Sequence, residues 1–247
     1  MQISNEAGKA VAEVKHVVIT GAGGGLGTQL TKLYCERGWF VYGYGRSEND
    51  ATRAAEAAYA GLYAFSSLNV MDTDAVNAAA ERLRAETEHI DVLINAAGIL
   101  TKNGEKHLED FDVDDSLRVF DINALGPLRM TKAFLPLLKK GETRVLVNIS
   151  SEAASMQTNN NYIRRYDYCM SKAAVNMQSV ILQRYLQPDG IKVLAVHPGW
   201  MQTEMGGKRA PIHPSVSAAG IMELVERYSH NLDSPIFMDY NGTPRPW

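Results

Sequence analysis

The sequence predicts an α/β protein: a single-domain, doubly wound parallel sheet with helices on both faces. Short apolar runs rich in β-branched residues alternate along the chain with longer segments whose apolar residues recur at helical spacing. The short runs are almost continuously apolar, which is typical of parallel strands covered on both sides. A glycine cluster at 20–27 directly follows the first of them. A (β/α)₈ barrel is the rival architecture at this length, but it does not predict that cluster.

Seven apolar runs are expected to be the strands of the sheet. They occupy residues 16–20, 39–45, 62–70, 90–95, 143–149, 191–197 and 235–239. The first helix is expected at 25–37, because its apolar residues fall on one face. An alanine-rich helix is expected at 50–60, and Asp72 can cap the helix that follows it with its side chain.

Three further helices complete the pattern. A long helical region at 113–140 contains Pro127, which should bend or restart it. The helix at 166–186 is ended by Pro188 and Gly190, and the last helix is expected to begin near Pro214.

The composition excludes several classes of function. The 247 residues include 25 basic and 28 acidic side chains, a formal net charge of −3, whereas a nucleic-acid or anionic-membrane surface would need a basic excess. No run approaches the roughly 18 apolar residues of a membrane span, and residues 1–15 lack the apolar core of a signal peptide. The six histidines show no metal-ligand spacing, so no metal site is expected.

The cysteine content and the absence of a linker indicate where the protein works and how it is divided. Cys35 and Cys169 are too few for a disulfide framework and fit a reducing compartment, so we expect a cytoplasmic protein. No internal repeat or linker-like break interrupts the chain, and residues 1–247 are expected to form one domain.

The glycine cluster favours binding of a dinucleotide. Gly21, Gly25 and Gly27 follow the spacing G-x-x-x-G-x-G between a predicted strand and a predicted helix. Glycine permits positive φ in such a turn and lets backbone N–H groups and the helix N-terminus approach a pyrophosphate. Because a flexible loop would look similar in isolation, the position of the cluster carries the argument for a Rossmann-type fold.

A Tyr-x-x-x-Lys pattern occurs once, at Tyr168 and Lys172. Four residues apart on a helix, the phenol and the ammonium lie on one face and can interact. A nearby ammonium stabilises a phenolate, so it is expected to lower the pKa of the tyrosine from about 10. The alternative interpretation is an ordinary solvated pair.

Several motifs together resemble the short-chain dehydrogenase/reductase superfamily. Residues 20–27 (TGAGGGLG) resemble its cofactor motif, and 95–98 (NAAG) resemble the motif that follows the fourth strand. The matches come in family order over nearly the whole chain. They also include Asn123 in DINALG, Ser151 after NIS, Tyr168 and Lys172 in YCMSK, and Pro198, Gly199 and Thr203 in HPGWMQT.

The resemblance implies a role for each matched residue. Tyr168 is the general acid, Lys172 holds the nicotinamide ribose, Ser151 hydrogen-bonds the carbonyl oxygen, and Asn123 supports a water next to the lysine. Residues expected to bind the cofactor are Gly21, Gly25, Leu26, Gly27, Arg46, Asn69, Val70, Asn95, Ala96, Gly98, Tyr168, Lys172, Pro198, Gly199 and Thr203.

A closer resemblance is to the branch of carbonyl reductases that includes C-factor-like and sniffer-like proteins, carried by HPGWMQTEMGG and the C-terminal NGTPRPW. The segment between Ser151 and Tyr168 is several residues longer than the compact family pattern, which leaves Ser150 and Ser155 as substitutes for Ser151. Two loops, 152–167 and 201–213, are expected to select the substrate. Their polar residues include Asn159, Asn160, Asn161, Tyr162, Arg164, Arg165, Lys208 and Arg209.

The end of the second strand bears on the choice of cofactor. An acidic residue at that point would bind the ribose hydroxyls of NAD, but this strand ends in Gly45 and Arg46. An arginine can bind a phosphate with two parallel hydrogen bonds, and in the family it implies NADP. Glu48 and Asp50 lie nearby and could reach a ribose. We therefore expect NADP(H) to be preferred over NAD(H).

The sequence thus predicts NADPH-dependent reduction of a ketone or aldehyde to an alcohol, or the reverse oxidation, on a small-molecule substrate. A non-catalytic NADP-binding sensor and an NAD-dependent alcohol dehydrogenase are the alternatives. A homodimer or homotetramer formed through the helices at 113–140 and 166–186 is expected from the resemblance.

Overall fold

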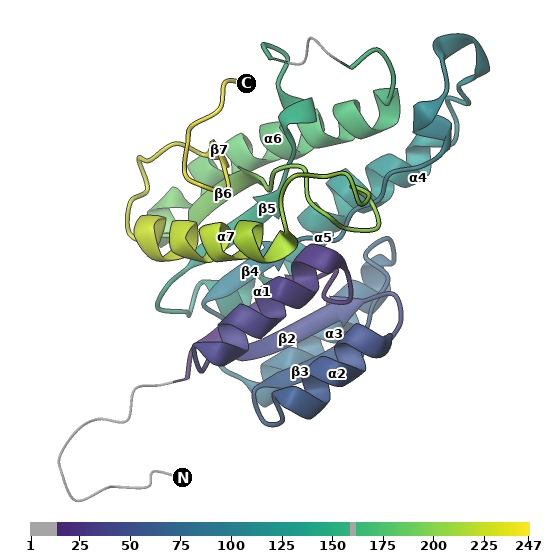
Figure 1. Ribbon diagram of the computed structural model, residues 1–247. Coiled ribbons are helices and arrows are strands. Elements are labelled where there is room, and N and C mark those ends of the chain that lie inside the picture. Colours follow the sequence, from purple (N-terminus) through teal and green to yellow (C-terminus); the bar gives the residue numbers. More distant parts are fainter. Residues whose placement is uncertain (1–13, 159–161) are drawn as a thin grey trace, which may run out of the picture.

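The computed structural model describes residues 14–158 and 162–247, and the expected strands form one parallel sheet of seven in the order β3-β2-β1-β4-β5-β6-β7 (Figure 1). The predicted doubly wound fold is confirmed. The strands are β1 (His16–Thr20), β2 (Phe40–Gly45), β3 (Tyr63–Ser67), β4 (Val92–Asn95), β5 (Val145–Ile149), β6 (Lys192–His197) and β7 (Phe237–Asp239).

The largest departure from the predicted bounds is β3, which ends three residues before the apolar run does. Its last ladder pair joins Ser67 to Gly45, the last residue of β2. Leu68 then donates its N–H to the carbonyl of Gly45 at 2.6 Å and turns away, because no further strand residue remains for it to pair with. Leu68 and Val70 are buried among the helices instead.

Two layers of helices cover the sheet (Figure 1). One face carries α1 (Gly25–Glu36), α2 (Asp50–Ala58) and α7 (Pro214–Tyr228), and the other carries α3 (Thr73–Glu86), α5 (Gly126–Leu138) and α6 (Tyr166–Leu186). Side chains of each strand alternate between the two cores: Val17 and Ile19 pack toward α1, and Val18 packs toward α3 and α5. Asp72 caps α3 as predicted, since its carboxylate accepts the N–H of Ala75 at 2.9 Å.

The long helical region predicted at 113–140 is three segments. A short helix, α4 (Ser116–Phe120), continues through a π-helical turn at Asp121–Leu125 into α5. Pro127 lies directly after the π-helical turn and has no N–H to donate to it, so the helix changes from π to α at this point and continues. The wider π-helical turn places Asn123 inside the protein, fully buried.

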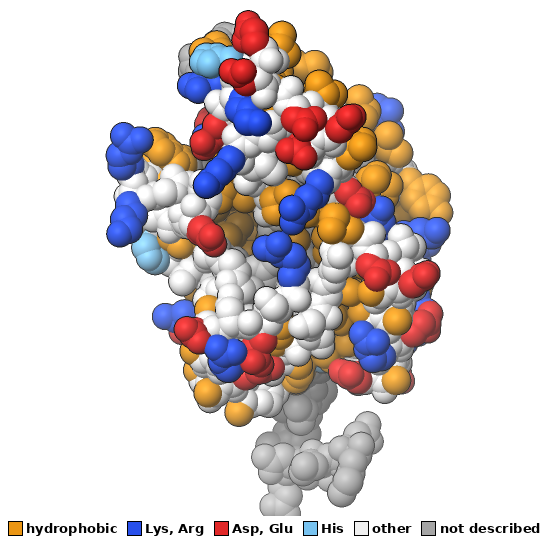
Figure 2. Space-filling view, turned by 90° about the vertical axis from the view of Figure 1, so that its right-hand side faces the viewer, with side chains coloured by type: hydrophobic (Ala, Val, Ile, Leu, Met, Phe, Trp, Pro, Cys, Tyr) orange, Lys and Arg blue, Asp and Glu red, His pale blue; other side chains and the backbone are white. Residues whose placement is uncertain are grey.

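β1 and β4 pair with each other, and the strands that follow them in the chain lie on opposite sides of this pair. The strand order therefore reverses between β1 and β4. In open α/β sheets the crevice at the carboxyl ends of such strands is where ligands bind. Figure 2 looks onto this edge and shows a recess with hydrophobic side chains inside it and Lys and Arg side chains around it.

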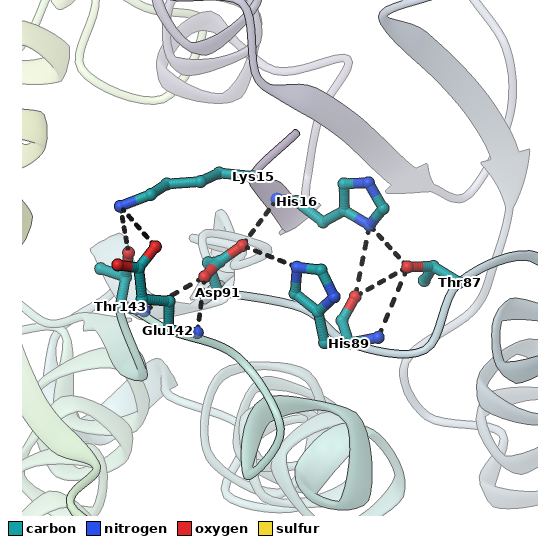
Figure 3. Close-up of polar contacts among 7 residues, drawn as sticks. All are labelled: Lys15, His16, Thr87, His89, Asp91, Glu142 and Thr143. Atoms are coloured by element: carbon teal, nitrogen blue, oxygen red, sulfur yellow. Dashed lines mark hydrogen bonds and ion pairs between the residues drawn. The ribbon is translucent and has the colours of Figure 1, made fainter. Parts of the chain in front are cut away.

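The opposite edge of the sheet is held by Asp91, a fully buried carboxylate just before β4 (Figure 3). Its oxygens accept the backbone N–H groups of His16 at 2.9 Å, Glu142 at 2.9 Å and Thr143 at 3.1 Å. The ring Nε2 of His89 lies 3.4 Å from the same carboxylate. One side chain thereby joins the starts of β1, β4 and β5.

Replacing Asp91 with alanine should lower the free energy of unfolding by about 3 kcal/mol, because three buried N–H groups lose their acceptor. Urea unfolding followed by circular dichroism measures this loss. Asp115→Ala is the matched control, since Asp115 is exposed and makes no capping bond, and it should change stability by less than about 0.5 kcal/mol. Equal midpoints for the two variants would contradict the role given to Asp91.

Candidate active site

The glycine loop turns tightly between β1 and α1 and lies against the loop that follows β4. Gly21 has φ of +70°, and a Cβ there would stand 3.0 Å from the backbone N of Ala97. A Cβ on Gly27 would overlap the carbonyl oxygen of Gly21, so the first turn of α1 can pack on the loop only if residue 27 is glycine. Gly25 faces Thr203, and a Cβ on Gly25 would lie 2.6 Å from the Cγ2 of that threonine. Leu26 is buried in the core.

The NAAG segment is tied to the end of β1 by one hydroxyl. The Oγ1 of Thr20 accepts the N–H groups of Ala96 and Ala97, both at 3.1 Å. Asn95 itself is buried, and its amide donates to the Oδ1 of Asn148 at 2.9 Å. Its side chain therefore joins neighbouring strands and does not extend from the edge. The Oδ1 of Asn95 is buried and has no hydrogen-bond partner among the described residues.

Asn123 binds the backbone of Ile99 twice. Its Oδ1 accepts the N–H of Ile99 at 2.8 Å and its Nδ2 donates to the carbonyl of Ile99 at 3.0 Å. The same Nδ2 lies 3.1 Å from the Oγ of Ser171 on α6. The side chain expected to support a water is thus engaged in joining the π-helical turn, the loop after β4 and α6.

Ser151, Tyr168 and Lys172 come together between β5 and α6. Ser151 follows β5 and hydrogen-bonds the phenol of Tyr168, and it also accepts the N–H of Ala153 at 3.1 Å. Lys172 is buried, and its Nζ donates to the carbonyl of Ile149 at 2.7 Å. This Nζ lies 5.8 Å from the ring centroid of Tyr168, and a Cβ on Gly98 would be 3.7 Å from it.

The electrostatics of this group differ from the expectation for the Tyr/Lys pair. Burial raises the pKa of Tyr168 to about 12, while the hydrogen bond from Ser151 and the charge of Arg165 act to lower it. Burial also lowers the pKa of Lys172 to about 8. The predicted lowering of the tyrosine pKa by Lys172 is therefore wrong for this structure, because the amine is itself desolvated and its hydrogen bond goes to a carbonyl.

The structure separates the three serines that the sequence left as alternatives. Ser150 is buried and donates to the Oδ1 of Asn176 at 2.6 Å. Ser155 is fully buried and accepts the N–H of Thr158 at 3.1 Å. Ser151 is the one whose hydroxyl meets Tyr168.

The loops after β2 and β3 present Arg46 and Asn69 at the same edge, both exposed, while Val70 is buried against Gly126. Across residues 14–158 and 162–247, Arg46 makes neither a hydrogen bond nor an ion pair. The carboxylates that the sequence placed near it, Glu48 and Asp50, both pair with Arg53, at 2.9 and 2.5 Å.

The loop after β6 closes over the glycine loop from the other side. Pro198 is buried, and Gly199 has φ of +79°, where a Cβ would overlap the side chain of Ile212. Thr203 contacts Gly25 across this gap and accepts the N–H of Gly206 at 3.1 Å. In the same loop Lys208 and Arg209 are exposed.

The base of the 152–167 loop is anchored to the C-terminal segment, which sequence reasoning missed. Arg245 lies 2.7 Å from Asp239 at the end of β7 and 3.2 Å from Glu152. His197, at the end of β6, accepts the N–H of Glu152 at 3.0 Å, and burial lowers its pKa to about 4. Within the rest of this loop, Asn159, Asn160 and Asn161 lie outside the described residues.

Asp167 is a second residue that sequence reasoning missed. It is fully buried next to Tyr168, whose N–H it accepts at 2.8 Å, and it also accepts the hydroxyl of Thr101 at 3.1 Å. An acidic residue in the first turn of a predicted helix was the only signal for it, and that signal also fits a solvent-exposed charge.

Comparison with known proteins identifies the family. The family model described as short chain dehydrogenase matches residues 15–212. The chain belongs to the short-chain dehydrogenase family, and it is an enzyme of that family.

Individual relatives agree with the carbonyl-reductase branch that the sequence indicated. The chain is 40% identical over 161 residues to C-signal of Myxococcus xanthus, a match that covers 65% of this chain and 95% of the relative. The NADPH-bound carbonyl reductase from chicken fatty liver superposes with a TM-score of 0.83 at 26% identity, covering 95% of this chain and 100% of that one. The carbonyl reductase Sniffer of D. melanogaster gives 0.83 at 25% identity, with the same coverage.

The described part of the chain contains neither a membrane-spanning helix nor a group of metal ligands. No helix in residues 14–158 and 162–247 is both long enough and apolar enough to cross a membrane. In the same part of the chain no three His, Cys, Asp or Glu side chains are grouped as metal ligands.

Proposed function

We propose that this protein reduces a ketone or aldehyde to an alcohol with NADPH, or performs the reverse oxidation. The observation that carries the proposal is the meeting of Ser151, Tyr168 and Lys172 at the sheet edge that also holds the glycine loop. A protein that only binds a dinucleotide needs the loop but has no use for a half-buried phenol hydrogen-bonded to a serine.

The residues at this edge fit a nicotinamide dinucleotide. No side chain caps the N-terminus of α1 at Gly24, which leaves the first N–H groups of this helix able to bind a pyrophosphate. The exposed Arg46 has no partner in the described chain and can bind a 2′-phosphate. Gly98 leaves room beside the Nζ of Lys172, where a ribose hydroxyl could accept its proton. When bound, the cofactor supplies the hydride.

The side chains of this protein position the carbonyl and manage its charge. Tyr168, with a pKa near 12, stays protonated at neutral pH and holds a proton at its hydroxyl that it can give to the carbonyl oxygen. Ser151 hydrogen-bonds the same oxygen and so stabilises the charge that develops on it. Lys172, with a pKa near 8, remains largely an ammonium at pH 7 and would hold the nicotinamide ribose through its Nζ.

One domain supplies both cofactor and substrate contacts in this proposal, and substrate choice lies in the loops 152–167 and 201–213. We also propose a cytoplasmic location. The cysteines support it, because two cysteines, Cys35 and Cys169, are too few for a disulfide framework and fit a reducing compartment.

The first test is the variant Tyr168→Phe. Losing the acid should reduce NADPH-dependent turnover of a carbonyl panel by about a hundredfold or more, while the dissociation constant for NADPH changes little. Absorbance at 340 nm and fluorescence titration measure the two quantities. Tyr59→Phe is the matched control, since Tyr59 follows α2 and its hydroxyl donates to Glu36 at the end of α1, so this variant should keep full activity. NADPH binding without turnover of any compound by the unmodified protein would favour a sensor instead.

The second test concerns the cofactor. The kcat/KM for NADPH should exceed that for NADH at least about tenfold, and Arg46→Ala should remove most of this preference by weakening NADPH alone. Steady-state kinetics with each cofactor measures the ratio. Arg37→Ala serves as the control, because Arg37 is paired with Glu226 at the far end of α1. Equal efficiency with the two cofactors in the unmodified protein would contradict the assignment and favour an NAD-dependent alcohol dehydrogenase.

The third test concerns self-association. We propose a homodimer or homotetramer formed through the outer faces of α5 and α6, where large apolar side chains are exposed. They are Leu125, Leu128, Met170, Met177, Ile181 and Tyr185. Light scattering at micromolar concentration should show an oligomer, and Ile181→Glu should reduce its mass, because a buried charge without a partner opposes association. Leu108→Glu, equally exposed but on another segment, should leave the mass unchanged. A monomeric unmodified protein would overturn the proposal.

A further inference from the structure

The hydroxyl of Ser151 is oriented by the short 3₁₀ turn that follows it, at Glu152–Ala154. Its Oγ accepts the N–H of Ala153 at 3.1 Å, and its backbone carbonyl accepts the N–H of Ala154 at 3.0 Å. The bond from Ala153 occupies the oxygen, so the hydroxyl hydrogen remains for the phenol of Tyr168 or for a carbonyl oxygen. The direction in which this hydroxyl points therefore depends on where the turn lies.

The turn is held from two directions. His197, the last residue of β6, accepts the N–H of Glu152 through its Nδ1 at 3.0 Å. The Oε2 of Glu152 lies 3.2 Å from the Nη2 of Arg245 and 3.9 Å from the Nε2 of His197. Ala154 is buried in a small apolar cluster with side chains of β6 and β7. Both the backbone and the side chain of the residue after Ser151 are thus engaged.

Arg245 lies on the segment that runs back along β7. Its N–H donates to the carbonyl of Phe237 at 3.0 Å, which fixes its backbone. Its Nη1 donates to Asp239 at 2.7 Å and its Nη2 donates to Glu152 at 3.2 Å, and the side chain is only 19% exposed. The planar guanidinium therefore bridges a carboxylate of its own segment and the carboxylate beside Ser151, which the single ammonium of a lysine would do less well.

The same segment contacts the 152–167 loop a second time. The carbonyl of Trp247 accepts the N–H of Gln157 at 3.0 Å, and the ring of Trp247 stacks on Phe237 with the centroids 5.4 Å apart. Residues 152 and 157 are therefore both held by this segment. The contact at Glu152 is the one next to Ser151, so it is the one that can orient the hydroxyl.

Arg245 also helps to keep His197 in the form that the turn needs. Burial is the main cause that lowers the pKa of His197 to about 4, and the charge of Arg245 adds to it. The ring is therefore neutral at pH 7, and its Nδ1 can accept the N–H of Glu152. Arg245 thus supports the backbone bond of Glu152 as well as pairing with its carboxylate.

We propose that Arg245 is a positioning residue: by holding Glu152 it orients the hydroxyl of Ser151 toward the carbonyl oxygen of the substrate. Without the ion pair the turn loses its tie to the C-terminal segment at this point. The hydroxyl then stabilises the charge that develops on the oxygen less well, because such stabilisation depends on a preorganised donor. This inference rests on the proposed carbonyl reduction and adds a residue that acts on it from a distant part of the chain.

Two variants break the ion pair from opposite sides. Glu152→Ala leaves Arg245 bound to Asp239, so the C-terminal segment keeps its own contacts. Arg245→Gln leaves in place the hydrogen bond between Glu152 and Tyr162, which Glu152→Ala also removes. The effect that the two variants share is therefore that of the ion pair.

Each variant should lower kcat about tenfold for the most rapidly reduced compound of the carbonyl panel, with less than about a twofold change in KM for NADPH, since a misplaced donor affects the reaction and not the glycine loop. Steady-state kinetics measures both constants. Arg37→Gln is the matched control, because it breaks an arginine–glutamate pair of 2.8 Å between α1 and α7 and should change neither constant. An unchanged kcat in both Glu152→Ala and Arg245→Gln would overturn the inference.

A double-mutant comparison separates positioning from a general loosening of the fold. Arg245→Gln should cost about tenfold in kcat in the unmodified protein but less than about twofold in Ser151→Ala, where no hydroxyl remains to be oriented. A loosened fold would cost the same in both backgrounds, and that result would contradict the role given to Arg245.

Hydrogen exchange followed by mass spectrometry tests the tie without any turnover. In both variants the amides of residues 152–157 should exchange at least about fivefold faster, while those of β1 and α1 keep their rates. Unchanged exchange at 152–157, or faster exchange throughout the sheet, would overturn the inference. If the unmodified protein reduces no carbonyl compound, the proposed reaction is contradicted, whereas faster exchange confined to 152–157 still supports Arg245 as the residue that holds the turn after Ser151.

Discussion

The paired hydrogen bonds between Asn123 and Ile99 hold together the segments on which the candidate site depends. They join the π-helical turn before α5 to the loop that follows β4, and the contact of the same amide with Ser171 adds α6. A fully buried amide with these partners tolerates little displacement, because each lost bond would leave a buried polar group without a partner. The loop after β4 in turn touches the glycine loop at Gly21. The loop after β4, which touches the glycine loop, is thereby linked through one side chain to α6, the helix that carries Tyr168 and Lys172.

Burial, more than charge pairing, governs the chemistry of Tyr168 and Lys172. Desolvation raises the pKa of the phenol and lowers that of the amine, which disfavours the charged form of each. The phenol therefore keeps its proton, and its pKa falls only where positive charges or hydrogen-bond donors lie next to it. Ser151 and Arg165 act in this way.

Sequence periodicity predicts most of this fold because parallel strands buried on both faces are the most apolar runs in the chain. It fails where pairing with a neighbouring strand determines the end of a strand. At β3 the apolar run continues beyond Ser67, but Ser67 already pairs with Gly45, the last residue of β2. The candidate site is predictable where spacing is local, as for Tyr168 and Lys172 on one helix. Ser151 could not be separated from Ser150 and Ser155, since only the hydrogen-bond partners that they find in the folded chain distinguish them.

Contacts between segments far apart in the chain could not be predicted either, because local spacing gives no information about them. Arg245 and Glu152 are 93 residues apart, and nothing in either neighbourhood indicates the other. Yet this ion pair and the bond from Glu152 to His197 fix the residue that follows Ser151.

The 152–167 loop is therefore held where it leaves β5, at Glu152, and again where it enters α6, at Asp167. Because Glu152 is bonded to the end of β6 and Asp167 to the loop after β4, the backbone beside Ser151 and beside Tyr168 is fixed by contacts with the rest of the fold.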